Sequence, residues 1–565
     1  MKKKILFLLT SIAIVGCQQN SDNQITEGHY VTGKHGMVVS AHPQSSRIGV
    51  SILKKGGNAA DAAVATEFAL AVCHPEAGNI GGGGFMVIRT KDGNSDFIDY
   101  REKAPFFSSV DMFLNPEGAV NEGLSTKTHL ASGVPGTVDG MIKVHSRYGK
   151  LPFRDVIQPS IDLAKNGYKL KKEQAESLNS NRENFITKNK SRTPFVKDSE
   201  WKEGDILIQP ELAETLERIR DNGREGFYSG KTAQLIVAEM KRGNGIISEQ
   251  DLKDYNAVFR NPLICNYKGY RMISAPPPSG GGLILFQILG MVESYPLKEW
   301  GFHSVKSIHL IVEAERRAFA DRAAYYGDPD FVKVPVNDLL DHDYLAGRMT
   351  DFNENRASLS TDVIEGSPVG YESEETTHYS VVDAFGNAVA ATTTINGWYG
   401  SSIIVDGAGF LLNNEMDDFS AKKGIPNISG LTGSDANSIM PGKRMLSSMT
   451  PTIVEKDRKL FLIAGSPGSS TIPTSVFQVI INVTDYDMNI MQAVDTGRFH
   501  HQWLPDMISF EKKGLDTLTI QKLRELGHIT RPVSALGRVN AIQVLQDGEL
   551  AGAADKRGDN SACGY

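Results

Sequence analysis

Apolar residues recur at helical spacing along much of the chain. Repeats at i, i+3 and i+4 predict helices that bury one face. Glycine pairs such as Gly56-Gly57 interrupt the pattern and mark helix ends. The expected helices span residues 44–56, 59–73, 137–147, 154–166, 210–221, 231–241, 303–325, 473–484, 490–496 and 515–526.

Other segments alternate apolar and polar residues, which predicts strands. A KDGN turn and a Gly386-Asn387 turn each separate two such segments, as in β-hairpins. Helices mixed with antiparallel hairpins suit an α+β protein in which two sheets pack face to face between helical layers. The expected strands span 84–90, 96–100, 378–383, 388–395, 403–405, 452–455, 460–464, 507–510 and 540–545.

The N-terminus has the pattern of an export signal. Lys2, Lys3 and Lys4 precede the short apolar run ILFLLTSIAIV, and Cys17 follows in a lipobox-like IVGC sequence. We expect a signal peptide over 1–16, a lipid on Cys17 and a tether over 17–30. The alternative is an ordinary signal peptide with a chance cysteine. Gln18 favours the periplasmic side of an outer membrane, with the cell surface or the soluble periplasm as alternatives.

Charge, cysteine content and the motifs present limit the classes of function that the chain could have. The chain has 565 residues, a net charge of −7 and a pI near 6.0, which argues against a nucleic-acid partner. Three further cysteines, Cys73, Cys265 and Cys563, have no disulfide-like spacing. Since no CxxC, HExxH or similar motif occurs, we expect neither a metal nor a cofactor.

A threonine pair carries the most specific chemistry. Thr376 and Thr377 stand where a polar, turn-like stretch ends and a strand pattern begins. A threonine hydroxyl becomes a good nucleophile when it starts a chain, because the free α-amine beside it acts as its base. The chain is therefore expected to be a precursor that cuts itself between Glu375 and Thr376. The alternative is that the pair merely begins a strand, where threonine is common.

Nine blocks, from about residue 30 to Tyr565, resemble those of the γ-glutamyltransferases (γ-glutamyl transpeptidases), which are N-terminal-nucleophile hydrolases. The resemblance implies a four-layer αββα sandwich, shared by a large subunit (31–375) and a small subunit (376–565) that stay paired after cleavage. The blocks, in family order, are HPEAGNIGGGGFMVI, DYREKAP, SGVPGTVDGM, PPPSGGG, TTHYSVVDAFGNAVA, LLNNEMDDFSA, LSSMTPTIV, AGSPGSS and RFHHQWLPD.

The resemblance also assigns the reacting groups. Thr376 is the nucleophile and its α-amine the base, while the Thr394 hydroxyl orients it. Backbone N–H groups of Gly468 and Ser469 form the oxyanion hole. Many family members have Gly-Gly at this position, so the serine side chain should be dispensable if Ser469 does not need a positive φ.

A γ-glutamyl substrate presents a carboxylate and an ammonium on one carbon, so its pocket needs both signs of charge. By resemblance, Arg101, Ser447 and Ser448 bind the carboxylate, which suits a guanidinium because it can donate two parallel hydrogen bonds. By the same resemblance, the ammonium is bound by Asn396, Glu415 and Asp418.

Three other features have a structural interpretation. Gly81–Gly84 lack the ending of a phosphate loop, so close backbone packing is expected. PPPSGGG (276–282) reads as a rigid turn into a helix. His500 and His501 are expected to pack and hydrogen-bond, although a metal or base role is the alternative.

The segment 422–444 resembles the loop that covers the substrate in bacterial relatives. Ser429 stands where a tyrosine is common, so we expect an intact but looser lid.

The resemblance therefore predicts a self-processing enzyme that transfers the γ-glutamyl group of glutathione and related compounds to water, amino acids or peptides. One alternative is an acylase for poly-γ-glutamate or a β-lactam side chain. The other is a lipoprotein that binds glutathione without turnover, which would need Thr376 to remain unprocessed.

Overall fold

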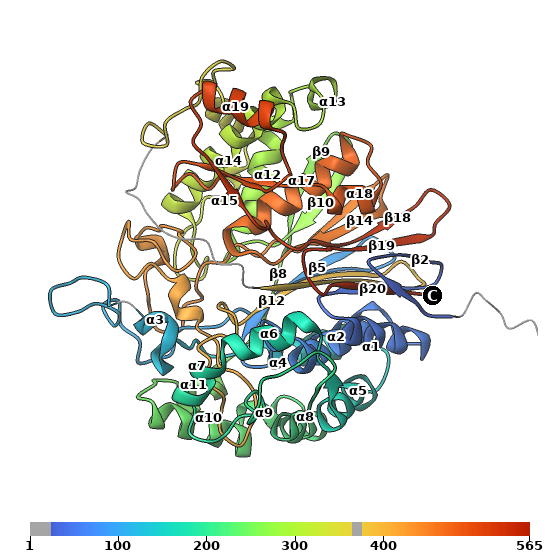
Figure 1. The fold of residues 1–565 in the computed structure, drawn as a ribbon, viewed down its shortest axis with the longest axis vertical. Helices are drawn as coiled ribbons and strands as arrows, with labels where there is room; N and C mark the ends of the chain where they lie inside the picture. The colour runs from blue at the N-terminus through green and yellow to red at the C-terminus, as the bar shows by residue number, and fades with distance from the viewer. Residues whose placement is uncertain (1–23, 122, 364–375) are drawn as a thin grey trace, which may run out of the picture.

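Two antiparallel sheets lie face to face at the centre of the molecule, with helices on both outer sides (Figure 1). The structure is a computed structural model that describes residues 24–121, 123–363 and 376–565. This arrangement confirms the four-layer αββα sandwich.

A central strand of the eight-stranded sheet, β11, begins at the second residue of the threonine pair. β11 lies between β3 and β12, so strands flank it on both sides. The sheet also brings together strands from the two ends of the chain. In spatial order its strands are β1 (Thr26–Gly28), β20 (Ser561–Gly564), β3 (Met37–Ser40), β11 (Thr377–Val382), β12 (Ala388–Thr394), β4 (Gly83–Arg89), β5 (Ser95–Asp99) and β8 (Val258–Arg260).

The second sheet has seven strands and covers the inner face of the first. Its strands also pair antiparallel, with one irregularity between Val454 and Glu455. In spatial order they are β2 (Tyr30–Gly33), β19 (Leu550–Ala554), β18 (Asn540–Val544), β14 (Lys459–Gly465), β13 (Thr452–Lys456), β10 (Tyr270–Ser274) and β9 (Leu263–Tyr267).

Helices below the eight-stranded sheet surround α2 (Ala59–Cys73), which is buried along its whole length. Asn58 caps α2 by accepting from the Asp61 N–H, and the Asp61 carboxylate accepts from the Asn58 N–H. The other helices of this layer are α1 (Pro43–Lys54), α3 (Leu124–Lys127), α4 (Thr137–Tyr148), α5 (Phe153–Asn166), α6 (Lys172–Ser180), α7 (Arg182–Lys188), α8 (Pro210–Asn222), α9 (Glu225–Tyr228), α10 (Gly230–Arg242) and α11 (Glu249–Asp254).

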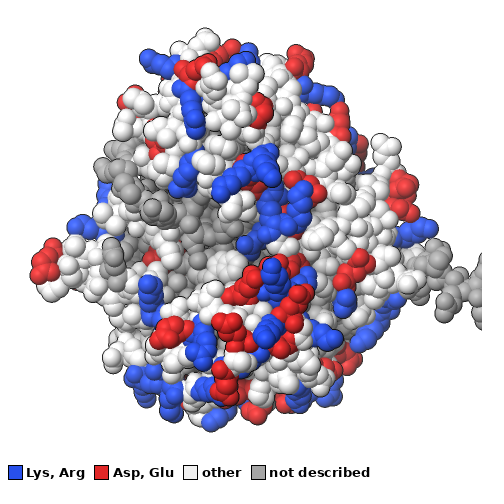
Figure 2. All heavy atoms as spheres, viewed as in Figure 1, with Lys and Arg blue, Asp and Glu red and all other residues white. Residues whose placement is uncertain are grey.

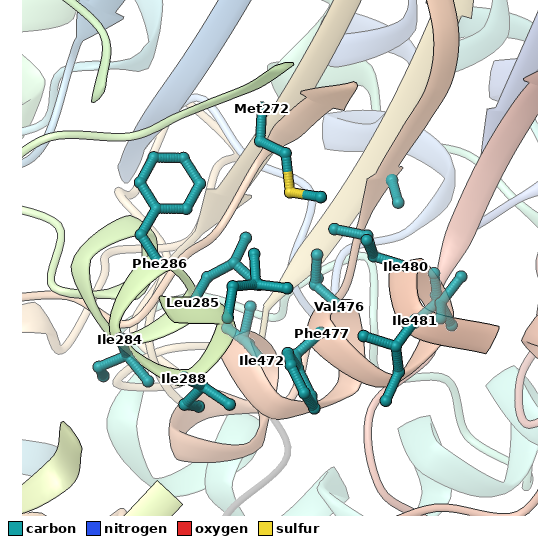
Figure 3. Packing of buried hydrophobic residues seen from close by; sticks show 14 of the residues in the cluster. Met272, Ile284, Leu285, Phe286, Ile288, Ile472, Val476, Phe477, Ile480 and Ile481 are labelled. Carbon is teal, nitrogen blue, oxygen red and sulfur yellow. The ribbon is translucent and has the colours of Figure 1, made fainter. Parts of the chain in front are cut away.

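The opposite layer packs on the seven-stranded sheet. Leu285 of α12 points toward Ile472 and Val476 of α17 in the hydrophobic core (Figure 3). The helices here are α12 (Gly281–Val292), α13 (Leu297–Trp300), α14 (Val305–Tyr325), α15 (Val336–Leu339), α16 (His342–Arg348), α17 (Ile472–Thr484), α18 (Ile490–Asp495) and α19 (Thr517–Glu525). Small sheets are formed by β15 (Phe499–His500), β16 (Ile508–Glu511) and β17 (Thr530–Val533), and by β6 (Tyr168–Lys169) and β7 (Ile206–Leu207).

The predicted helices are all present within a few residues, and PPPSGGG does lead into α12. The predicted strand at 403–405 is wrong, because only one isolated bridge, between Ile404 and Leu411, forms there. Gly407 and Gly409 both have positive φ and turn the chain back before a ladder can grow.

The predicted tether over 17–30 is too long, because β1 begins at Thr26 and pairs with β20. The signal peptide, Cys17 and Glu375 lie outside the described residues.

Surface charge is mixed. On the face shown in Figure 2, Lys and Arg side chains are interspersed with Asp and Glu. Among the helices of the described segments, none is long and apolar enough to cross a bilayer.

Candidate active site

Thr376 lies immediately before β11 and is 7% exposed. Thr377 pairs with Thr393 in the ladder between β11 and β12, so the next position outward sets Thr376 opposite Thr394. The Thr394 hydroxyl accepts from the Asn396 N–H at 2.7 Å. Two threonine side chains from one hairpin thus reach the same end of the central strands.

A small cavity opens beside these threonines. Its volume is about 20 Å³, room for about one water molecule. Each predicted catalytic or substrate-binding residue except Gly468 lines it, although these residues come from segments far apart in the chain. The lining residues are Arg101, Arg322, Thr376, Thr394, Asn396, Glu415, Asp418, Leu431, Leu446, Ser447, Ser448, Met449, Ser469 and Ile472.

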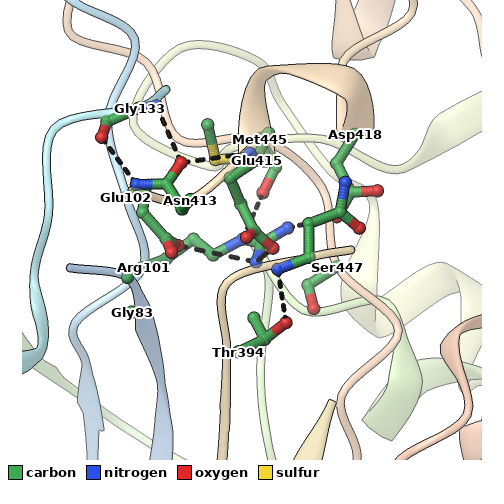
Figure 4. A network of polar contacts seen from close by, with 12 residues as sticks. Gly83, Arg101, Glu102, Gly133, Thr394, Asn413, Glu415, Asp418, Met445 and Ser447 are labelled. Atoms are coloured by element: carbon green, nitrogen blue, oxygen red, sulfur yellow. Dashed lines mark hydrogen bonds and ion pairs between the residues drawn. The ribbon is translucent and has the colours of Figure 1, made fainter. Parts of the chain in front are cut away.

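Arg101 is fully buried and paired with acids (Figure 4). One terminal nitrogen pairs with Glu415 and the other with Asp418. Glu102 lies 3.5 Å away, and Arg101 Nε donates to the Met445 carbonyl at 3.3 Å. The residues predicted to bind opposite ends of a zwitterion therefore bind each other.

Three acids, Glu102, Glu415 and Asp418, lie beside Arg101, and a second arginine, Arg322, lines the same cavity. Burial raises the pKa of Glu415 well above its usual value and that of Glu102 to about 7, although Arg101 lowers both. Burial opposes the charge of Arg101 itself, but the acids raise its pKa overall. Burial therefore favours the neutral forms of Glu102 and Glu415, and Arg101 favours their charged forms.

Asn413 holds the acidic segment in place. Its amide oxygen accepts from the Glu415 N–H at 3.0 Å, and its amide nitrogen donates to Gly81 O and Gly133 O at 2.8 Å each. Asn413 was not among the predicted site residues, although it lies within LLNNEMDDFSA.

The serine pair is held by the PPPSGGG turn. Ser447 N donates to Pro278 O at 3.0 Å, and Gly280 N donates to Ser447 O at 2.7 Å. The Ser448 hydroxyl is buried and has no hydrogen-bond partner among the described residues. A cavity-lining hydroxyl of this kind suits a substrate carboxylate.

Ser469 has a positive φ, +47°. The expectation that its side chain is dispensable assumed that no positive φ is needed at this position. A serine in this region is strained, whereas glycine is not. The Ser469 hydroxyl donates to that of Ser429. The side chain at this position therefore has a specific partner on the 422–444 segment.

That segment covers the cavity. Leu431 lines it, the Asn427 side chain donates to Asp418 at 3.1 Å, and Ile428 N donates to Asp417 at 2.9 Å. The predicted lid is therefore anchored by polar contacts where family members often carry a tyrosine. A lid looser than that of relatives with the tyrosine stays a prediction.

The glycine run behind the hairpin packs as predicted. A Cβ at Gly82 would lie 2.1 Å from the Thr394 carbonyl oxygen, so only glycine lets the backbones approach this closely. The run thus supports the Thr394 end of β12.

Arg322, on α14, was not singled out from the sequence. It lines the cavity and is 5% exposed. Burial lowers its pKa to about 10, partly offset by Asp418. One indication was available, since this arginine is among the last residues of a strongly patterned helix.

The remaining candidates are structural. His500 hydrogen-bonds Thr474 at 2.8 Å, and His501 lies 3.2 Å from Asp506. Cys73, Cys265 and Cys563 are free thiols.

Comparison with known proteins gives a consistent result. The family model described as gamma-glutamyltranspeptidase matches residues 45–565. The chain is 46% identical over 540 residues to the glutathione hydrolase proenzyme of Escherichia coli K12, covering 95% of this chain and 93% of that protein.

Two solved structures are also similar. Cephalosporin acylase from Bacillus halodurans superposes with a TM-score of 0.81 over 99% of both chains, at 24% identity, which shows the fold alone. Helicobacter pylori gamma-glutamyltranspeptidase matches with a TM-score of 0.57 at 44% identity, over 58% of this chain and 94% of that one.

Proposed function

The chain belongs to the gamma-glutamyltranspeptidase family, and from this premise we propose that it is a self-processing glutathione hydrolase and γ-glutamyltransferase. One observation carries the site assignment: Thr376, at the start of a central strand, lines the same cavity as Arg101 and its acids. No cofactor takes part in the proposed chemistry.

Self-cleavage uses the Thr376 hydroxyl first. It attacks the carbonyl of Glu375, the peptide N–C bond breaks, and the acyl group moves to the oxygen as an ester. Water hydrolyses this ester, releasing a new carboxyl group on Glu375 and a free α-amine on Thr376. That amine is the base for turnover, so processing creates the catalytic group.

Turnover repeats the attack on a γ-glutamyl donor. The Thr376 amine takes the hydroxyl proton while the hydroxyl attacks the γ-carbonyl, and backbone N–H groups of Gly468 and Ser469 stabilise the oxyanion. The leaving amine takes a proton and departs. Water, an amino acid or a peptide then removes the γ-glutamyl group from the threonine.

Substrate recognition requires an exchange of ion pairs, because the cavity is too small for a glutamyl group while Arg101 holds Glu415 and Asp418. The α-carboxylate takes Arg101, with Ser447 and Ser448 as further donors. The α-ammonium takes the two acids and Asn396. Each buried charge then keeps an opposite partner.

Location is a separate proposal that rests on the N-terminal sequence. A lipid on Cys17 would hold the exported enzyme on the periplasmic side of an outer membrane, where it would scavenge glutathione. Unchanged growth of a deletion strain on glutathione as sole sulfur source would count against this role.

The decisive test is the intact mass and N-terminal sequence of the purified protein beside Thr376→Ala. We expect two fragments from the wild type, the smaller starting TTHYS, and one chain from the variant. A single wild-type chain would leave Thr376 without its amine and would favour a binding protein without turnover.

An acylase is less well supported. A buried arginine with acids beside it suits a substrate with a free α-amino acid head. A substrate without such a head offers no charges to replace these ion pairs, so Arg101 would stay paired with Glu415 and Asp418.

A further inference from the structure

Two histidines and a glutamate form a buried cluster between α14 and α19, which lie side by side at the top of Figure 1. His309 and Glu313 are one turn apart on α14, and His528 follows the end of α19. His309 Nδ1 lies 2.7 Å from His528 Nε2, and the three possible ligand atoms lie within 4.8 Å of one another. None of the three lines the active-site cavity.

The His309 ring is oriented as in a metal ligand. Its Nε2 faces the Asn353 carbonyl oxygen at 2.9 Å, so that nitrogen carries the proton. The lone pair of Nδ1 then faces His528. Metal-binding histidines are commonly held by such a hydrogen bond from the other ring nitrogen to a carbonyl.

The Glu313 carboxylate keeps unused lone pairs. One oxygen accepts from the Ser358 N–H at 3.1 Å and lies 3.4 Å from Arg316 Nε, and the other accepts from Arg317 at 2.7 Å. Since each carboxylate oxygen has about two lone-pair sites, both oxygens can accept another partner.

The local charge also suits a cation. Arg317 pairs with Asp351 as well as Glu313, and Arg316 pairs with Asp506 as well as Glu313. Three carboxylates against two guanidiniums leave one negative charge in excess.

We propose that His309, Glu313 and His528 bind one Zn²⁺ ion. Two imidazoles, one carboxylate and a water make a common tetrahedral zinc environment. Zn–N bonds of about 2.0–2.1 Å would place the two nitrogens about 3.3 Å apart, so the rings must separate slightly and Glu313 must move closer.

The site would have a structural role. His309 and Glu313 precede Thr376 in the chain and His528 follows it, so the ion would tie together the two chains that cleavage produces. This consequence rests on the proposed self-cleavage, whereas the binding of zinc does not.

The test uses full-length protein without a histidine tag, stripped of metal and titrated with ZnCl₂ against a chromophoric chelator. We expect one equivalent to bind with a Kd of about 1 µM or tighter. Co²⁺ in place of Zn²⁺ should give visible absorption bands of a four-coordinate site. Absence of a stoichiometric site in the wild type would overturn the proposal without any variant.

Two variants locate the site. His528→Gln removes one ligand, while its amide can still donate to His309, and should weaken Zn²⁺ binding by about 100-fold or more. His342→Gln is the matched control, because His342 is an exposed histidine next to Asp343. Equal affinity in His528→Gln and wild type, or an equal loss in both variants, would overturn the assignment.

A last measurement separates this proposal from the proposed function. Uncleaved Thr376→Ala should bind Zn²⁺ like the wild type, whether or not the wild type cleaves itself. In cleaved protein, a chelator should lower the urea concentration at which the two chains separate. No change on chelation would refute the bridging role.

Discussion

Replacing Ser469 by glycine tests how the oxyanion turn and the lid are connected. Ser469 has a φ of +47°, which costs a non-glycine residue about 1–2 kcal/mol. Glycine relieves this strain but adds about 0.4–1 kcal/mol of unfolded-state entropy. It also removes the hydrogen bond to Ser429, whose net worth is about 0.5–1.5 kcal/mol. The three terms nearly cancel, so global stability should change by no more than about 1 kcal/mol.

In Ser469→Gly, we expect kcat to stay nearly unchanged while KM rises. The backbone donors of Gly468 and residue 469 remain, so kcat for a chromogenic γ-glutamyl anilide should stay within about 3-fold of wild type. KM should rise, by up to about 10-fold, because the lid loses one contact that holds it closed.

A double-mutant cycle with Ser429→Ala isolates the contact between the two hydroxyls. If they act as a latch, the two single variants and the double variant should have similar KM values, with a coupling energy of about 1 kcal/mol. Coupling below about 0.3 kcal/mol would refute the latch. A loss of kcat above about 100-fold in Ser469→Gly would instead show that the serine side chain contributes to the chemistry.

The remaining predictions concern charge and packing. Burial raises the pKa of Glu67 from 4.5 to about 7. Between these two pH values the folded state holds a proton that the unfolded state has released, so the free energy of unfolding falls as the pH rises from 4.5 to about 7. Thermal unfolding of Glu67→Gln should therefore show less loss between pH 5 and 8, by up to about 3 kcal/mol. Gly465→Ala should destabilise the protein by about 1–3 kcal/mol, because its Cβ would lie 2.2 Å from the buried His378 ring, and a chemical unfolding curve measures this. Arg322→Gln should raise the pKa of the Asp418 carboxyl, visible as a shift of the acidic limb of the kcat/KM profile to higher pH; an unmoved limb would contradict it. Glu415→Gln should keep kcat/KM within about 10-fold in the same assay, since the second acid still faces the ammonium.

The fold could be predicted where local pattern and burial agree. α2 is apolar or small along its length and begins at a capping asparagine, so its bounds were predicted at 59–73 as observed. The hairpin of β11 and β12 follows from alternation and the Gly386-Asn387 turn.

Short strands defined by distant partners could not be predicted. β20 is only Ser561–Gly564, with no alternation, and it exists because it lies between β1 and β3 from the other end of the chain. Pairing over such sequence distances depends on the packed fold, which a local pattern does not encode.

At the site, too, the residues could be predicted from local motifs, but the contacts between distant segments could not. Motifs identified Arg101, Glu415 and Ser469, but their mutual contacts were not visible in the motifs. Ser429 and Ser469 are 40 residues apart, and each appeared only as a departure from a common family residue. In the structure the two departures meet in one hydrogen bond.

The pairing of Arg101 with Glu415 and Asp418 bears directly on substrate choice. A buried ion pair is costly to break unless both partners find replacements. A ligand with only a carboxylate would leave the acids unpaired, and one with only an ammonium would leave Arg101 still engaged and the cavity closed. A ligand that carries both charges can separate the ion pairs and offer each side a replacement partner. The pocket therefore discriminates through the charges it already holds, before any contact with the rest of the substrate is made.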